Sequence, residues 1–315
     1  RVDCSLQGFL SSTARGLTPL TPANIDKTDD YVLPSFNVRF SLRDDLDLRF
    51  AASKTMVRPD FDDLNPGTTL TSPGPTLPGQ GTGGNPNLES PESTNADASL
   101  EWWFRPGSAL TGGVFYHDIK DYIQIFNNPE TIGGETYQVS RPRNTDAELQ
   151  GFEVAYTQFF DMLPGWWSGW GVQLNYTMID SSAQTPDLRT DPTGQTFREA
   201  DVTNVSDDAY NAILIYENFG LSARLAYNWR SDYIESYNQS GAQPPAVVVK
   251  DAAQMDFSLG YDVSENITLS FDATNLLDRP VYNYFGSSSS RDEFLFPRDV
   301  RSNDRTFSLG LRVRL

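Results

Sequence analysis

The chain has 315 residues, enough for one large β domain or two ordinary domains, and its hydrophobic content of 38% and mean hydropathy of −0.46 are modest. Its formal net charge of −18 excludes a strongly basic nucleic-acid-binding surface. Cys4 and His117 are the only residues of their types, so the sequence predicts no Cys/His metal site and no nucleophilic catalytic centre. Cys4 is either a free thiol or bridged to a partner outside this chain.

No stretch of 18 or more residues is strongly apolar and free of charge, so the sequence predicts no transmembrane helix. A transmembrane strand needs only about 9–11 residues, and only every second one must be apolar. A barrel can therefore be hydrophilic on average. The aromatic content of 12% fits either ordinary packing of strands or rings placed at the membrane interfaces.

Alternation of apolar and polar residues dominates the chain from residue 37 onward and predicts strands rather than helices. The clearest case is the last strand, where Phe307, Leu309 and Leu311 alternate with Ser308 and Gly310. About eleven strands are predicted, ten of them by alternation and one, residues 210–217, as a segment that is apolar on both faces and whose orientation is left open. In chain order they cover residues 37–42, 46–53, 98–104, 114–116, 152–156, 172–178, 210–217, 221–229, 255–261, 267–274 and 305–315.

The connections between these strands alternate strictly between short and long. The short turns fall at residues 43–45, 105–108, 163–171, 218–220 and 264–266. The long connections, rich in Gly, Pro, Ser, Asn and Asp, fall at residues 57–95, 126–145, 181–207, 231–250 and 278–303. Short periplasmic turns and long extracellular loops are typical of bacterial outer-membrane barrels. The pattern therefore predicts an all-β antiparallel transmembrane barrel.

The alternation also predicts which side chains face lipid. On the hairpin at 255–274, an apolar set faces lipid and a polar set faces the lumen, because a charge at the lipid midplane costs about 2–4 kcal/mol, or less for Asp. The apolar set is Met255, Phe257, Leu259, Ile267, Leu269 and Phe271, and the polar set is Asp256, Thr268 and Asp272. A ring of aromatic residues beside the short turns is predicted to lie near the periplasmic interface: Trp102, Trp103, Phe159, Phe160, Trp166, Trp167 and Phe219.

Strand parity predicts that residues 1–315 form only part of a barrel. If the long loops are extracellular, the last strand ends on the periplasmic side, whereas the first one starts on the extracellular side. An open sheet would leave unpaired backbone groups in lipid, so further strands, odd in number, are expected to pair with residues 37–42 and 305–315.

Possible catalytic motifs have simpler explanations. The segment Gly79–Gly84, GQGTGG, lies in a Pro/Ser/Thr-rich loop with no helix after it, so it is not a phosphate-binding loop. The adjacent acids at 44–45, 62–63 and 207–208 lie on predicted turns and connections, where solvation explains them. The chain is therefore predicted not to be an enzyme, with no cofactor and no metal.

Aromatic residues in and beside the long loops are candidates for ligand contact. They could anchor the strands at the interface or pack within the loops. They could also form a platform for a sugar, a siderophore or an aromatic ligand. The candidate ligand-binding set is Arg230, Tyr233, Tyr237, Tyr282, Tyr284 and Phe285.

Several segments resemble TonB-dependent outer-membrane receptors. Asp272–Gly286, DATNLLDRPVYNYFG, is similar to an element of their penultimate strand and following loop. Tyr31–Pro66, with VLPSFNVRFSLRDDLDLRF, resembles their mid-barrel hairpin, and Gly84–Phe104 and Tyr116–Ile123 resemble the elements that follow. These motifs span about residues 30–300 in the family's usual order. Leu315 departs from the pattern, since a terminal Phe is common.

The resemblance implies the C-terminal half of a 22-stranded barrel in the outer membrane, with an N-terminal plug that lies outside this chain. It implies energised import of a scarce small nutrient, such as a siderophore or an oligosaccharide. The implied partners are the TonB complex, acting through the plug, and the lipid and lipopolysaccharide of the membrane. The alternatives are a passive porin or structural barrel, and a soluble carbohydrate-binding β-protein.

Overall fold

The computed structural model describes residues 2–9, 22–71, 73–74, 79–186, 196–237, 246–286 and 294–314. Within these ranges the chain is almost entirely β-structure, with one short 3-10 helix, η1 (Gly165–Gly169). The described residues include no helix that is long and apolar enough to cross a membrane.

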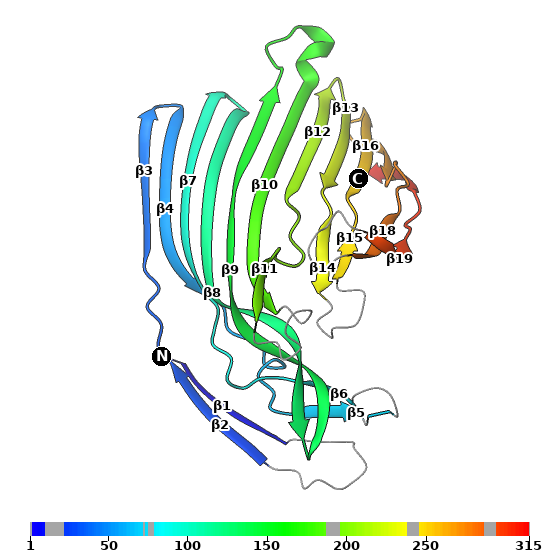
Figure 1. Ribbon diagram of the computed structural model, residues 1–315. Helices are drawn as coiled ribbons and strands as arrows, with labels where there is room; N and C mark the ends of the chain where they lie inside the picture. The colour runs from blue at the N-terminus through cyan, green and yellow to red at the C-terminus, as the bar shows by residue number, and fades with distance from the viewer. Residues whose placement is uncertain are drawn as a thin grey trace.

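In the described part of the chain, eleven antiparallel strands lie side by side along one curved, 14-stranded sheet, and these eleven strands are here called the wall (Figure 1). Each wall strand pairs with the wall strands that come before and after it in the chain, from β3 to β20. The predicted number of strands is therefore confirmed. They are β3 (Ser35–Arg43), β4 (Leu46–Met56), β7 (Glu92–Arg105), β8 (Ser108–Ile132), β9 (Glu135–Phe159), β10 (Trp170–Pro186), β12 (Asp208–Asn218), β13 (Leu221–Arg230), β16 (Ala252–Ser264), β17 (Ile267–Thr274) and β20 (Thr306–Val313).

The wall does not close on itself among the described residues. β3 and β20 stand at its two ends, and β20 pairs with β17 alone. All five predicted short turns join neighbouring wall strands at the expected places. At one of them the backbone of Phe219 and Gly220 adopts φ of 53° and 72°, the left-handed conformation that tight hairpin turns require.

Strand register separates the wall into an apolar and a polar face, as the alternation predicts. Leu259 lies opposite Phe271 and Tyr261 opposite Leu269, whereas Asp262 lies opposite Thr268. Directly opposed residues share a face of the sheet, so the predicted apolar and polar sets of this hairpin are confirmed as opposite faces. The ring of Phe271 continues the apolar face by contacting the rings of Phe257 and Phe307.

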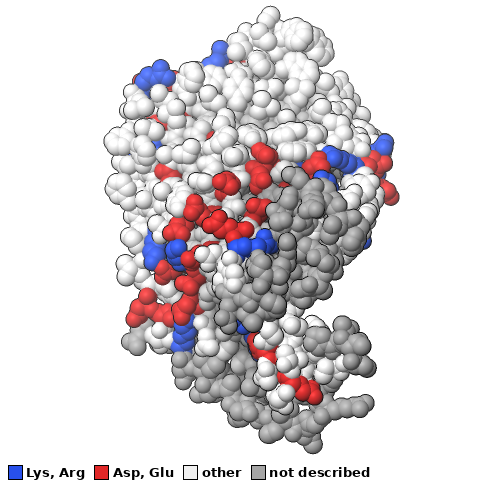
Figure 2. All heavy atoms as spheres, in the orientation of Figure 1, with Lys and Arg blue, Asp and Glu red and all other residues white. Residues whose placement is uncertain are grey.

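The apolar face is largely uncovered. Leu309 is 86% exposed, Leu311 66% and Val114 58%. Figure 2 shows mostly uncharged residues over the half of the wall that carries the short turns, the turn-side half, apart from a few Lys and Arg side chains at its rim. Acidic side chains gather toward the opposite half, which carries the long connections and is called the loop-side half. An apolar band of this kind suits a lipid surrounding rather than water.

Charged side chains on the polar face are paired between strands near β3. Arg39 contacts Asp47, which is 2% exposed, and Arg49 contacts Glu101 at 2.9 Å. The carboxylates are thus held by arginines of the neighbouring strand.

The predicted turn-side aromatic residues do lie beside the short turns and do not form a buried core. Trp166 is 64% exposed, Trp167 65% and Phe219 58%. Trp166 contacts Phe219 with ring centroids 4.8 Å apart, which joins the η1 turn to the next hairpin turn. Trp102 donates a hydrogen bond from Nε1 to the carboxylate of Asp45 at 2.9 Å.

The long connections, predicted only as loops, contain further strands. β8 and β9 continue as paired strands through residues 126–145 and turn at Gly133-Gly134. The other connections contain β5 (Thr68–Thr71), β6 (Gly79–Gly83), β11 (Phe197–Ala200), β14 (Tyr233–Tyr237), β15 (Ala246–Val249), β18 (Val281–Gly286) and β19 (Phe294–Arg301). Outside lipid, backbone groups still gain from pairing, and the strands extend wherever a partner is present.

A hairpin that the alternation did not predict precedes the wall. β1 (Val2–Phe9) pairs with β2 (Pro22–Asp29), and the backbone of Cys4 lies opposite Lys27 in this ribbon. Figure 1 shows the hairpin at the loop-side end of the molecule. Lys27 ties the hairpin to the connection between β6 and β7, because its Nζ lies 2.9 Å from a carboxylate oxygen of Glu89.

Candidate functional site

The predicted ligand-binding residues lie in and beside a second sheet at the loop-side end of the wall. Its antiparallel strand order is β14-β15-β18-β19. β14 follows wall strand β13, β15 precedes β16, and β18 and β19 lie between β17 and β20. This loop-side sheet is therefore built from continuations of four wall strands (Figure 1).

The centre of the loop-side sheet is packed as in a water-soluble protein. Ala246 and Val248 of β15 are 0% exposed, and Ile234 of β14 is 2% exposed. Asn283 of β18 is also 0% exposed, and its Nδ2 donates to Asp299 at 3.0 Å. The buried centre makes the sheet a rigid support for the side chains at its margins.

Ion pairs connect the two edge strands of the loop-side sheet. Glu235 of β14 lies 2.8 Å from Arg298 and 3.5 Å from Arg301, both on β19. Glu235 and Arg298 both stand at register shifts, where one strand has an extra residue. The two edge strands can touch only if the sheet is curled, and a β-bulge increases the local bend of a strand. The two bulges therefore bring Glu235 close to Arg298 and Arg301.

Two candidates, Arg230 and Tyr233, contact each other. The guanidinium carbon of Arg230 lies 4.6 Å from the ring centroid of Tyr233, and its Nη2 donates to the Tyr233 hydroxyl at 3.3 Å. Tyr237 donates from its hydroxyl to the carbonyl oxygen of Asp201 at 3.0 Å, while the guanidinium carbon of Arg198 lies 5.5 Å from the Tyr237 ring. These contacts orient both tyrosine rings.

The six candidates do not form one continuous platform, because register divides them between the two faces of the sheet. Tyr233 of β14 lies opposite Val249 of β15, and Val249 lies opposite Asn283 of β18. Phe285, two residues after Asn283, shares this face with Tyr233. Tyr282 and Tyr284 alternate with those residues and belong to the other face, where their ring centroids are 6.3 Å apart. The Tyr282 side chain is 39% exposed and is more exposed than that of Tyr284.

Sequence reasoning missed a second loop-side cluster centred on Arg141 of β9. Its Nε lies 2.9 Å from Glu130 of β8, its Nη2 donates to the Thr68 hydroxyl at 2.8 Å and its Nη1 to the carbonyl oxygen of Gly84 at 2.8 Å. β6 pairs in parallel with β9 beside it, over a core of Leu70, Tyr137 and Val139. Residues 126–145 were expected to be loop, and the partners lie far away in sequence, so no local pattern marks the cluster.

Acidic residues surround the point where β8 leaves the wall. The pairing register of β8 with β9 changes between Ile119 and Tyr122, and Asp121 has a φ of 58°. Burial, followed by repulsion from Glu89 and Asp146, raises the pKa of Asp121 above its ordinary value. Lys120 offsets part of this charge through its contact with Asp146 at 3.2 Å.

The side chains around the loop-side sheet are of kinds that occur often in binding sites. Within the described ranges, no group of three or more His, Cys, Asp or Glu side chains is placed to hold a metal ion. The side chains that the loop-side sheet offers are aromatic rings, arginines and amides, which stack on and hydrogen-bond to ligands.

Comparison with known protein families decides the assignment. Residues 9–276 match the family model described as TonB dependent receptor-like, beta-barrel. The chain belongs to this TonB-dependent receptor family. The membership confirms the predicted barrel and its location in the outer membrane, and it confirms that the chain is not an enzyme.

Solved structures of siderophore receptors share the fold. A ferric enterobactin receptor, PfeA of Pseudomonas aeruginosa, matches with 17% identity and a TM-score of 0.62 over 92% of this chain and 40% of its own. The siderophore receptor PirA of Acinetobacter baumannii matches with 16% identity and a TM-score of 0.59 over 92% and 41%. The ferric yersiniabactin uptake receptor FyuA of Yersinia pestis matches with 17% identity and a TM-score of 0.57 over 94% and 39%.

The chain thus spans about 40% of the length of these receptors. A search of curated proteins finds no significant match.

Proposed function

We propose that this chain is the C-terminal part of the barrel of an outer-membrane receptor that imports a scarce nutrient by TonB-driven movement of a plug. The observation that carries the proposal is the family match over residues 9–276, on a wall whose faces are divided into apolar and polar. The open ends β3 and β20 support further strands in the same barrel, because unpaired backbone groups in lipid cost several kcal/mol each.

The nutrient class that the comparisons favour is a ferric siderophore, since the solved relatives are named as receptors for such compounds. An oligosaccharide is the second candidate. Stacking rings beside arginine would serve either ligand, so the loop-side sheet does not separate them. The apolar face of the wall would contact membrane lipid, and its loop-side rim would contact lipopolysaccharide.

Uptake by the full-length receptor in a receptor-deficient host tests the proposal. Cells are supplied with a panel of ferric siderophores as the sole iron source, or oligosaccharides as the sole carbon source, with and without functional TonB. Growth that needs both the receptor and TonB supports energised import. Uptake that continues unchanged without TonB, together with steady ion conductance in planar bilayers, would instead assign the chain to a passive porin.

We also propose that the ligand contacts the loop-side sheet through Arg230, Tyr233, Tyr237, Tyr282, Tyr284 and Phe285. Because these residues divide between two faces, replacing each face separately is informative. We expect Tyr282→Ala with Tyr284→Ala, or Tyr233→Ala with Phe285→Ala, to weaken uptake about tenfold for the face that meets the ligand. Unchanged uptake in both double variants would refute the assignment.

A further inference from the structure

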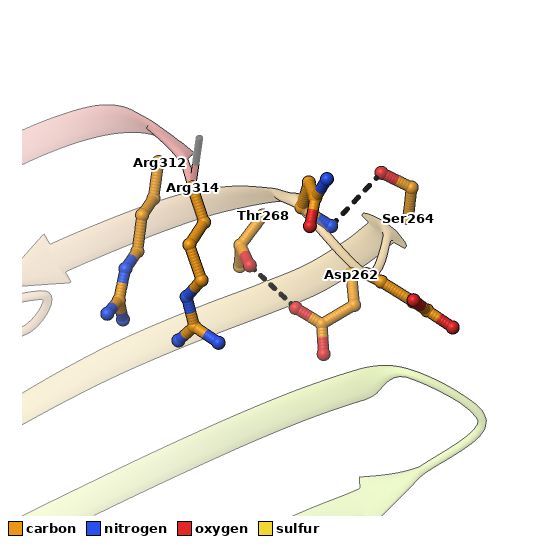
Figure 3. Close-up of a pocket in the computed structure, with 7 residues that line it drawn as sticks. Asp262, Ser264, Thr268, Arg312 and Arg314 are labelled. Carbon is orange, nitrogen blue, oxygen red and sulfur yellow. Dashed lines mark hydrogen bonds between the residues drawn. The ribbon is translucent and has the colours of Figure 1, made fainter.

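Two arginines near the end of β20 have no described carboxylate partner. Arg312 lies opposite Thr268, and the backbone N–H of Arg314 donates to the carbonyl oxygen of Asn266 at 2.9 Å. Figure 3 shows their side chains extending side by side on the side of the sheet that carries Thr268 and Asp262. Among the described residues, neither guanidinium forms an ion pair, and the Asp262 carboxylate instead accepts a hydrogen bond from Thr268 at 2.7 Å.

Asp262 and Glu265 line the same pocket as the two arginines, but neither carboxylate lies within ion-pair distance of Arg312 or Arg314. Residues two apart on a strand share a face about 7 Å apart, so the two positive charges repel each other. On β17, the strand that pairs with β20, the residue opposite Arg312 is Thr268, and the residue bonded to the backbone of Arg314 is Asn266, which directly precedes β17. Neither residue carries a charge. At the opposite end of the wall, by contrast, Arg39 and Arg49 each contact a carboxylate of the adjacent strand.

The same strand has an open backbone edge. β20 pairs with β17 on one side, and no other described strand pairs with it. A strand that completes this edge would place alternate side chains on the polar face, about 5 Å from those of β20. The unpaired edge and the unpaired charges thus meet at the same place.

We propose that the wall strand that pairs with β20 carries Asp or Glu on its lumen-facing positions beside Arg312 and Arg314, forming cross-strand ion pairs that join the two strands near the turn-side rim. This ion-pair seam goes beyond the nutrient import proposed above and does not depend on the ligand. Arginine suits the role because its planar guanidinium pairs with a carboxylate through two hydrogen bonds.

Charge reversal in the full-length receptor tests the seam. Arg312→Glu with Arg314→Glu is compared with Arg312→Lys with Arg314→Lys, which keeps the charges. Arg224→Glu is the matched control. Arg224 belongs to the polar face of β13, an interior strand of the wall, and lies opposite Ile215 on β12 and Ser258 on β16. The readout is the temperature at which the folded barrel in outer-membrane extracts loses its fast migration in gels.

We expect the double reversal to lower this temperature by roughly 5 °C or more, and the lysine pair and the Arg224→Glu control to change it by about 2 °C or less. Replacing the facing acid of the partner strand with Lys should restore the double-reversal variant. An unchanged transition in that variant, or no rescue by any Lys substitution along the partner strand, would overturn the proposal. An unchanged transition with new permeability to large antibiotics would assign the arginines to a segment inside the lumen instead.

Discussion

The two halves of the long β8–β9 ribbon follow different rules of packing. In the wall half, apolar side chains such as Val114, 58% exposed, point away from any core. In the loop-side half, Phe126, Tyr137 and Val139 are at most 2% exposed and pack as in a water-soluble protein. The bulge at Lys120-Asp121 separates the halves. The backbone pairing is the same in both halves, whereas the apolar side chains are uncovered in the wall half and packed in a core in the loop-side half.

The largest expected effect concerns the lipid-facing surface. Phe271→Arg should impair barrel assembly, because a buried cation at the lipid midplane costs about 2–4 kcal/mol. Ser270→Arg is the matched control. Its side chain shares the polar face with Gly260 and Gly310, which lie directly opposite and leave room for a long side chain. Heat-modifiable migration of the outer-membrane form measures assembly, and equal loss in both variants would contradict the assignment of faces.

The loop-side half should respond locally. Arg141→Met leaves Glu130 without its closest cation and should cost about 3 kcal/mol in the β5–β6–β9 region, without changing the melting of the wall. Arg143→Met provides the control, because Arg143 lies 3.9 Å from the same carboxylate and is more exposed. Protease cleavage between residues 57 and 91 on intact cells reports the opening. If the wall melts earlier in Arg141→Met, the two halves are not independent.

A glycine of the wall provides a test of intermediate size. A Cβ at Gly151 would collide with the carbonyl oxygen of Met178 and lie 2.7 Å from the Phe115 ring, whereas at Gly112 the nearest atom is 3.9 Å away. Gly151→Ala should therefore destabilise the wall by about 1–3 kcal/mol, and Gly112→Ala should have little effect. Denaturant titration of the receptor in detergent micelles compares them, and equal stability of the two variants would argue against the wall geometry.

The smallest expected effect lies at the boundary bulge. Because burial and neighbouring acids raise the pKa of Asp121, the folded rim binds its proton more tightly than the unfolded chain. The stability of the rim should therefore increase as pH falls from 7 through the raised pKa of folded Asp121 toward the ordinary carboxyl range. The same stability is lost when pH rises through that pKa. Asp121→Asn tolerates the φ of 58° and should stabilise the rim at neutral pH by about 0.5 kcal/mol.

Hydrogen exchange at the amides near residue 121, compared at pH 5 and pH 7, measures this difference. Asp118→Asn is a suitable control, because Asp118 contacts Lys120 at 3.4 Å in the same strand. A pH dependence in Asp121→Asn as steep as in the unchanged receptor would show that Asp121 is not its source.

The sequence predicts the wall well and the loop-side half poorly, for a physical reason. Period-two alternation places the wall strands other than β12, whose residues are apolar on both faces, because an apolar and a polar face impose opposite requirements on successive residues. β6, in contrast, pairs with β9 across more than 50 residues, and nothing within residues 79–83 signals that partner. The division of Tyr233 and Tyr284 between two faces depends on the register of a four-stranded sheet that alternation did not predict.

The candidate site shows the same limit. The aromatic residues were identifiable as loop-side rings, and they do gather on one sheet. Their orientation also depends on partners such as Asp201 and Arg198, which come from a different connection. Such contacts between loops leave no periodic pattern in the sequence.

Site-directed spin labelling along β17 in native outer membrane tests the central claim most directly. In a Cys4→Ser background, a nitroxide is attached in turn at residues 268, 269, 270, 271 and 272 of the full-length receptor. The wall predicts that labels at 269 and 271 are accessible to lipid-soluble oxygen and that labels at 268, 270 and 272 are not. Oxygen accessibility without a two-residue period, or with the opposite phase, would contradict the account.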